Sequence, residues 1–236
     1  MKYLKSYLKK SKSPFYSLIF TLPLLFIYEF YLFKLNKSDI SGLRNTADIF
    51  VRRLFSLFDI YGFYAVGFLV FLFLFISYYL HIKNNQNGKV KYSFFLLMLL
   101  ESVLYAILMI IILNKSQIFL SSSGLINSKN KAIVLALGAG VYEEFVFRVI
   151  VVTISLFFFN KILRLKKYIS TILTILLAST SFSIFHYLGP NGEIFQLSTF
   201  ILRSLAGLLL SVIYIFRGYG VTAYTHSIYD LILLYI

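Results

Sequence analysis

Residues 92–113 read YSFFLLMLLESVLYAILMIIIL, and Glu101 is the one charged side chain in this run. An apolar stretch of about 20 residues is long enough to cross the hydrocarbon core of a bilayer as an α-helix. A helix is also the open-chain structure that satisfies its own backbone hydrogen bonds there. Residues 92–113 are therefore predicted to form a transmembrane helix.

Six further stretches have the same character, so seven membrane helices are predicted. Residues 45–59 alternate large apolar side chains with Arg52, Arg53 and Asp59, which is typical of a helix lying in the membrane interface and would give an eighth membrane element. The predicted fold class is an all-α, polytopic transmembrane helix bundle with about seven to eight membrane helices. The seven stretches are residues 14–33, 60–80, 92–113, 132–159, 168–187, 197–216 and 219–236.

Composition agrees with a membrane protein and excludes several function classes. The chain is 59% hydrophobic and only 14% charged, whereas a soluble domain carries about 25% charged residues. The net charge of +14 does not require nucleic acid, because the bases lie between the apolar runs, where they suit lipid headgroups. Cysteine is absent, which excludes disulfides, cysteine-ligated zinc and thiol catalysis. We expect an integral membrane protein, in a bacterial plasma membrane, whose partners are the lipid bilayer and no nucleic acid.

Ionisable side chains gather in three of the predicted helices. An ionisable group inside a bilayer costs at least about 2.5 kcal/mol, so such groups are rare and usually functional. Each motif spaces two polar or aromatic side chains four residues apart, which puts them on one helical face. The sequence therefore predicts that three helices direct carboxylates and imidazoles into one pocket. The residues are Glu143, Glu144 and Arg148 in VYEEFVFRVI, Phe182 and His186 in SFSIFHYLG, and His226 and Asp230 in YTHSIYDLI.

The balance of charge in the predicted helices favours acid–base chemistry. The segments contain five acidic residues but only two arginines, Arg148 and Arg203. Full ionisation would leave uncompensated negative charge in a medium of low dielectric constant, so some acids must be neutral or paired. Adjacent Glu143 and Glu144 cannot both pair equally well with Arg148. One glutamate is then available as a general acid or base. Glu29 and Glu101 are interpreted as polar groups that help helices to pack.

The three motifs, in this order, resemble those of the CAAX prenyl protease and bacteriocin-processing (CPBP, or ABI) family of intramembrane peptidases. The family pattern is E-E-x-x-x-R, then F-x-x-x-H, then H-x-x-x-N/D, and the resemblance covers about residues 130–236. We accordingly divide the chain into N-terminal transmembrane helices with an interfacial segment, residues 1–130, and a CPBP-like catalytic transmembrane core, residues 131–236.

The resemblance implies an intramembrane endopeptidase, whose substrate is a peptide or protein in or at the membrane. Glu143 and His186 would activate a water that attacks a substrate carbonyl. His226 and Asp230 would bind the developing oxyanion or otherwise support it. Glu144 with Arg148 would hold the first helix in register, and Phe182 would support the site. The predicted catalytic residues are thus Glu143, Glu144, His186, His226 and Asp230, with Arg148 and Phe182 as structural support.

The family has been described both as metalloproteases and as metal-independent glutamate proteases. Two histidines and one glutamate would suffice to hold a catalytic zinc ion. The zinc helix signature H-E-x-x-H is absent, however, and the ligands would come from three separate helices. These observations favour a metal-free reaction without a cofactor. The alternative is zinc held by Glu143, His186 and His226.

Asp230 departs from the commonest family pattern, because many members have asparagine there. An asparagine amide can donate a hydrogen bond to an oxyanion, whereas an ionised aspartate only accepts. Asp230 must then be protonated, or it must orient His226 instead. Two other function classes also stay open. The chain would be either a catalytically silent relative, such as a membrane scaffold or a bacteriocin immunity factor, or a small transporter that uses the buried acids as a proton relay.

Overall fold

The computed structural model describes residues 2–34, 45–57, 63–84, 90–113, 129–188 and 192–235. Every regular element within these ranges is helical, which confirms the predicted all-α class. Residues 129–162 form one continuous helix that changes between α-helical and π-helical turns. The elements are α1 (Lys2–Ser11), α2 (Pro14–Lys34), α4 (Thr46–Ser56), α5 (Phe63–Asn84), α6 (Ser93–Ile112), α7 (Lys129–Gly138), η3 (Ala139–Glu143), η4 (Phe145–Val151), α8 (Val152–Phe157), η5 (Phe158–Ile162), α9 (Lys167–Phe185), α10 (Leu197–Arg217) and α11 (Tyr219–Leu233).

Five helices in the described part of the chain are long and apolar enough to cross a membrane, fewer than the seven to eight predicted. Each predicted stretch does coincide with a helix. The last stretch is not among the five because α11 has only 15 residues, and the stretch 60–80 begins outside the described residues, so the count does not exclude it as a span. The five spans are Pro14–Lys34, Ser93–Ile112, Ala132–Ile162, Lys167–Phe185 and Leu197–Arg217.

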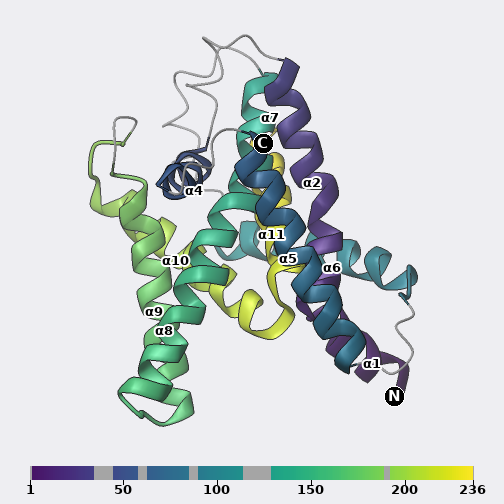
Figure 1. The fold of residues 1–236 in the computed structure, drawn as a ribbon. Helices are drawn as coiled ribbons and strands as arrows, with labels where there is room; N and C mark the ends of the chain where they lie inside the picture. The colour runs from purple at the N-terminus through teal and green to yellow at the C-terminus, as the bar shows by residue number, and fades with distance from the viewer. Residues whose placement is uncertain are drawn as a thin grey trace.

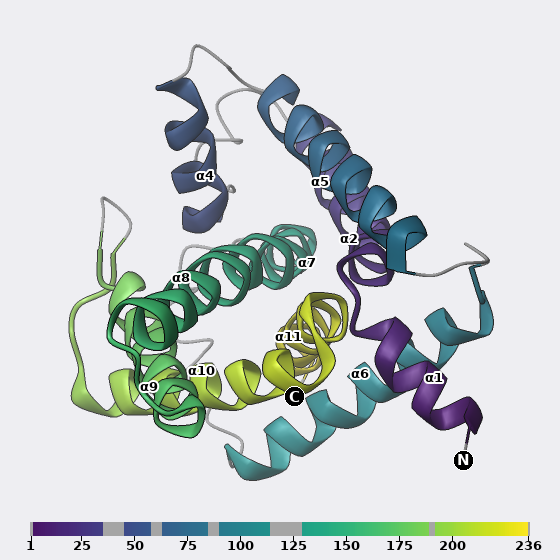
Figure 2. The same ribbon diagram turned by 60° about the horizontal axis from the view of Figure 1, so that its bottom comes forward.

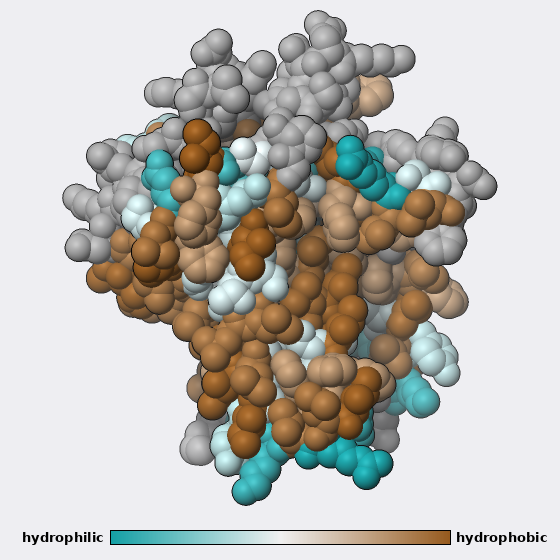
Figure 3. Space-filling model, turned by 90° about the vertical axis from the view of Figure 1, so that its left-hand side faces the viewer, coloured by the Kyte–Doolittle hydropathy of each residue, from teal (hydrophilic) through white to brown (hydrophobic). Residues whose placement is uncertain are grey.

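The surface of the bundle is suited to lipid. On the face shown in Figure 3, brown apolar residues form a broad zone between teal hydrophilic residues at the lower end and others near the top. Many large apolar side chains are exposed, among them Leu104, Ile154 and Phe216. The bases Lys161, in η5, and Arg164 and Lys166, in the turn between η5 and α9, are also exposed at the lower end of Figure 1. Exposed apolar side chains bounded by bases are typical of a protein embedded in a bilayer.

Helix α11 lies in the middle of the bundle, where α2, α6, α7, η3 and α10 all contact it (Figure 2). The chain turns from α10 into α11 at Gly218, whose φ of 81° favours glycine. Gly140 allows η3 to approach α11 closely, because a Cβ at this position would lie 2.0 Å from the Ser227 Oγ and 2.5 Å from the Ala223 carbonyl oxygen. Small residues commonly permit such close packing between membrane helices. This approach brings the two glutamates of η3 and its C-cap next to the histidine of α11.

Helix α4 lies where the sequence predicts an amphipathic segment, although residues 58 and 59 of that segment fall outside the described residues. Asn45 is its N-cap and accepts a hydrogen bond from the Ala47 backbone N–H at 2.8 Å. One face buries Ala47, Asp48 and Val51 against the bundle. Asparagine is among the best N-cap residues, which explains why the helix begins here.

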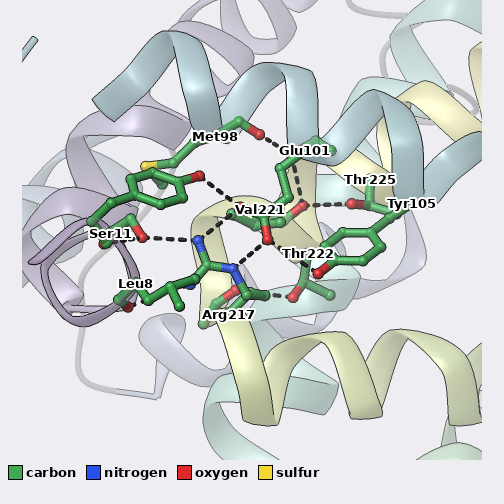
Figure 4. A network of polar contacts seen from close by, with 12 residues as sticks. Leu8, Ser11, Met98, Glu101, Tyr105, Arg217, Val221, Thr222 and Thr225 are labelled. Carbon is green, nitrogen blue, oxygen red and sulfur yellow. Dashed lines mark hydrogen bonds and ion pairs between the residues drawn. The ribbon is translucent and has the colours of Figure 1, made fainter. Parts of the chain in front are cut away.

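Glu101 ties α6 to two other parts of the fold. It forms an ion pair with Arg217 at the end of α10, and Tyr7 of α1 donates a hydrogen bond to it at 2.6 Å. Arg217 also donates to the Ser11 Oγ at 2.9 Å, so both side chains lie in one network of polar contacts (Figure 4). The expected role of Glu101 in helix packing agrees with these contacts.

Candidate active site

Glu143 and Glu144 lie at the junction of two π-helical stretches. Glu143 is the last residue of η3, Glu144 follows it, and Arg148 lies in η4. Glu143 is 7% exposed, and both Glu144 and Arg148 are fully buried. Turns of π-helix are rare and often occur at functional sites. The two neighbouring glutamates have different partners: Glu143 contacts Asn45, and Glu144 contacts Arg148 and His226.

Glu144 joins the continuous helix to α11. Its Oε1 atom lies 3.0 Å from the Arg148 Nη1 and 2.7 Å from the His226 Nδ1. Arg148 in turn donates from Nη2 to the Gly207 carbonyl of α10 at 3.3 Å, and its guanidinium carbon lies 4.6 Å from the centre of the Phe182 ring. Arg148 therefore contacts α9 and α10 while it pairs with Glu144. This is the geometry expected of the supporting role that the resemblance implies for the pair.

Phe182 is fully buried and lies beside the side chains of Arg148, His186 and His226, which come from three helices. Its ring centre is 5.0 Å from that of His186 and 5.9 Å from that of His226. Both contacts are edge-to-face, a favourable geometry for aromatic rings. The F-x-x-x-H spacing thus gives the two imidazoles a shared apolar neighbour, which restricts the orientations that each ring can adopt.

His186 is the C-cap of α9 and is half-buried. Its Nδ1 atom lies 2.9 Å from the Phe182 carbonyl oxygen. A carbonyl oxygen can only accept, so Nδ1 carries the proton of this hydrogen bond. In the neutral ring, Nε2 is then the nitrogen with a free lone pair. His186 can therefore accept a hydrogen bond from a water molecule through Nε2.

His226 and Asp230 are neighbours on one face of α11. The His226 Nε2 lies 3.5 Å from the Asp230 Oδ2, while Nδ1 faces Glu144. The Asp230 Oδ1 is buried and has no hydrogen-bond partner among the described residues. Both nitrogens of His226 thus face carboxyl oxygens, and one oxygen of Asp230 is left available for another group.

Glu143 has a partner that the sequence did not indicate. The Asn45 Nδ2 donates a hydrogen bond to the Glu143 Oε1 at 2.8 Å. Asn45 lies 98 residues earlier in the chain. Its position just before an amphipathic helix predicts only that it caps that helix. No spacing rule could have connected it to Glu143.

The five predicted catalytic residues lie near one another, with Glu143, Glu144 and His226 buried and His186 and Asp230 half-buried. Glu143 lies within electrostatic range of both His186 and His226. Glu144 contacts His226, and His226 lies beside Asp230. A separate apolar cavity of about 60 Å³ lies between α2, α4, α5 and η3. Tyr142 and Tyr219 line that cavity, and none of the five predicted catalytic residues does.

The side-chain arrangement does not fit a metal site. Across the ranges that the structure describes, no three histidine, aspartate or glutamate side chains are grouped closely enough to hold a metal ion. Each ring nitrogen of His226 already faces a carboxyl oxygen, Nδ1 that of Glu144 and Nε2 that of Asp230, which leaves neither free for a metal ion. The alternative set Glu143, His186 and His226 is therefore not arranged to hold a zinc ion.

The order and placement of these motifs agree with a comparison against protein families. Residues 128–232 match the family model of the Rce1-like type II CAAX prenyl endopeptidases. The predicted CPBP resemblance is thereby confirmed over this range, which contains all three motifs. The match, together with the apolar helices, supports an integral membrane protein and, at the level of the family, an intramembrane endopeptidase. Comparisons with curated proteins and with solved structures gave no match.

Proposed function

We propose that the protein is an intramembrane endopeptidase that hydrolyses a peptide bond with a water molecule activated by Glu143 and His186. One observation carries the proposal: buried Glu143 and His226 and half-buried His186, from three helices of the Rce1-like region, lie close enough to interact electrostatically. Ionisable groups on apolar helices are costly unless they serve each other or a substrate. The substrate is a peptide or protein in or at the membrane, and the membrane is a bacterial plasma membrane.

In this mechanism Glu143 is the general base. Its carboxylate takes a proton from the water as the water oxygen attacks the substrate carbonyl carbon, while the His186 Nε2 accepts the other O–H and orients the molecule. The C–N bond then breaks, and Glu143 returns the proton to the leaving nitrogen. Atoms and charge balance without any other reactant.

The oxyanion that forms during attack needs hydrogen-bond donors. His226 can supply one from Nε2 when both of its nitrogens are protonated, and Glu144 at Nδ1 balances the resulting positive charge. Asp230 supplies a second donor when its carboxyl is protonated. Glu144 and Arg148 hold these groups in place without contacting the substrate.

Purified protein in lipid vesicles tests this function directly. We expect it to cleave a membrane-embedded peptide at one bond, with activity that survives dialysis against a chelator. Activity lost on chelation and restored by zinc would replace the metal-free mechanism by the zinc alternative. No cleavage of any membrane peptide would favour a catalytically silent scaffold or immunity factor, and proton-coupled solute uptake would favour a transporter.

The Asp230→Asn variant is expected to keep most of its activity. An amide nitrogen donates a hydrogen bond to the oxyanion as a protonated carboxyl does, and the side chain keeps its shape. Turnover of the vesicle-embedded variant on the same peptide checks this. A fall by orders of magnitude would instead mean that an ionised Asp230 orients His226 by accepting from Nε2.

Replacing Glu101 by glutamine is expected to leave turnover per folded molecule unchanged. Glu101 contacts Tyr7, Tyr105 and Arg217, all outside the candidate active site. The lost charge should lower the stability by about 1–3 kcal/mol, because a hydrogen bond to a charged group is weakened. Thermal unfolding followed by circular dichroism, alongside turnover, separates the two effects. A loss of turnover without a loss of stability would give Glu101 a part in the reaction.

A further inference from the structure

Asn45 uses both ends of its side-chain amide. The Oδ1 atom caps α4 by accepting from the Ala47 N–H, and the Nδ2 atom donates to the Glu143 Oε1, each at 2.8 Å. The residue is 9% exposed. A cap alone needs only the oxygen, so serine, threonine or aspartate would serve equally well. The hydrogen bond to Glu143 requires the amide nitrogen, which serine, threonine and aspartate lack.

Helix α4 is fixed firmly enough to hold this contact. The Tyr28 hydroxyl of α2 donates to the Asp48 Oδ2 at 2.9 Å. Arg52 forms ion pairs of 2.6 Å with both Asp48 and Glu29. Glu29 also accepts from the Tyr142 hydroxyl at 2.6 Å, and Tyr142 immediately precedes Glu143. The network thus links α4 to α2 and to the helical turn that carries Glu143.

The chemistry of an amide suits the task of holding a general base. A lysine or histidine at this distance could give its proton to Glu143 and so consume the base. An amide N–H donates a hydrogen bond but does not transfer its proton at any ordinary pH. With Oε1 held by Asn45, the carboxylate orientation is fixed and Oε2 remains for water. Small displacements of a reacting group can cost about 100-fold in rate.

We propose that Asn45 is a positioning residue for Glu143, and that α4 thereby completes an active site whose other members lie in residues 128–232. The proposal rests on the proposed function, since it concerns how the base of that reaction is held. It extends the site to a helix outside the region that matches the Rce1-like family model.

Two variants separate the donor from the cap. Asn45→Ser keeps a neutral capping oxygen but is too short to reach Glu143, and Asn45→Asp keeps the cap while replacing the donor by an oxygen. Both are expected to lower kcat about 100-fold per folded molecule, with KM nearly unchanged. Thr46→Ala, at the exposed neighbouring position of α4, is the matched control and should behave as the wild type.

The measurements are kcat and KM on a membrane-embedded peptide, together with the folded fraction from circular dichroism and size exclusion. Wild-type kcat per folded molecule in Asn45→Ser, with or without a lower folded fraction, would overturn the positioning role and leave Asn45 as a cap. Should Asn45→Asp not fold because of its added charge, the uncharged serine variant decides. Activity retained by Glu143→Gln in the same assay would instead overturn the proposed function itself.

Discussion

Glu143→Gln is expected to lower kcat about 10²–10⁴-fold, the contribution typical of a general base. Glutamine keeps the size of the side chain and can still contact the Asn45 amide, but it cannot take a proton from water. The side chain is buried in the cluster and accepts from Asn45, so the fold should change little. The variant should therefore insert into the membrane and unfold at nearly the wild-type temperature while its turnover is lost. Single-turnover cleavage of a membrane-embedded peptide measures the effect.

His186→Ala serves as the companion variant, because it removes the second group that would orient the water. It should lower kcat at least about 100-fold, again with the protein still inserted. Glu101→Gln is the matched control for the loss of one carboxylate in a membrane helix. Normal cleavage by Glu143→Gln would transfer the role of base to Glu144 or end the interpretation of the chain as a peptidase.

The sequence predicted those features of the molecule that depend on local spacing. Periods of four residues placed Glu144 with Arg148, and His226 with Asp230, on common helical faces, and the structure has both pairs in contact. The apolar runs located the helices because a bilayer constrains length and polarity together. Five of the seven predicted stretches contain helices long and apolar enough to span a membrane in the described part of the chain. The last stretch does not, because α11 is short and packs against other helices, and an apolar run does not reveal whether lipid or protein covers it.

Contacts between distant parts of the chain could not be predicted in the same way. Asn45 and Glu143 meet because Tyr28, Asp48 and Arg52 fix α4 beside η3, and each of these residues alone looks like an ordinary surface or interfacial group in the sequence. The π-helical turns around Glu143 and Glu144 also leave no compositional signal. The two adjacent glutamates contact Asn45 and His226 respectively. The sequence indicated that Glu143 and Glu144 would have different environments, but not that Asn45 would be the partner of Glu143.

Arg148→Met is expected to have the largest effect on stability, about 3–5 kcal/mol, because it leaves the buried Glu144 carboxylate with too little compensating charge. Arg148 and Glu144 are both fully buried, and Arg148 also contacts the Gly207 carbonyl and the Phe182 ring. Methionine fills much of the same volume but supplies no charge and no hydrogen bond. Much of the variant should therefore fail to reach the folded state in the membrane, as measured by the monodisperse fraction and by thermal unfolding.

Pairing this change with Glu144→Gln tests the reason for the loss. The double variant Glu144→Gln/Arg148→Met removes the uncompensated carboxylate, and a glutamine oxygen can still accept from the His226 Nδ1, so about half of the lost stability should return. Arg53→Met is the matched control, since Arg53 is an exposed residue of α4 and its replacement should change stability by less than about 0.5 kcal/mol. A double variant as unstable as Arg148→Met alone would contradict this explanation. Arg148 would then stabilise the fold through its contacts with Phe182 and Gly207, and not by compensating the charge of Glu144.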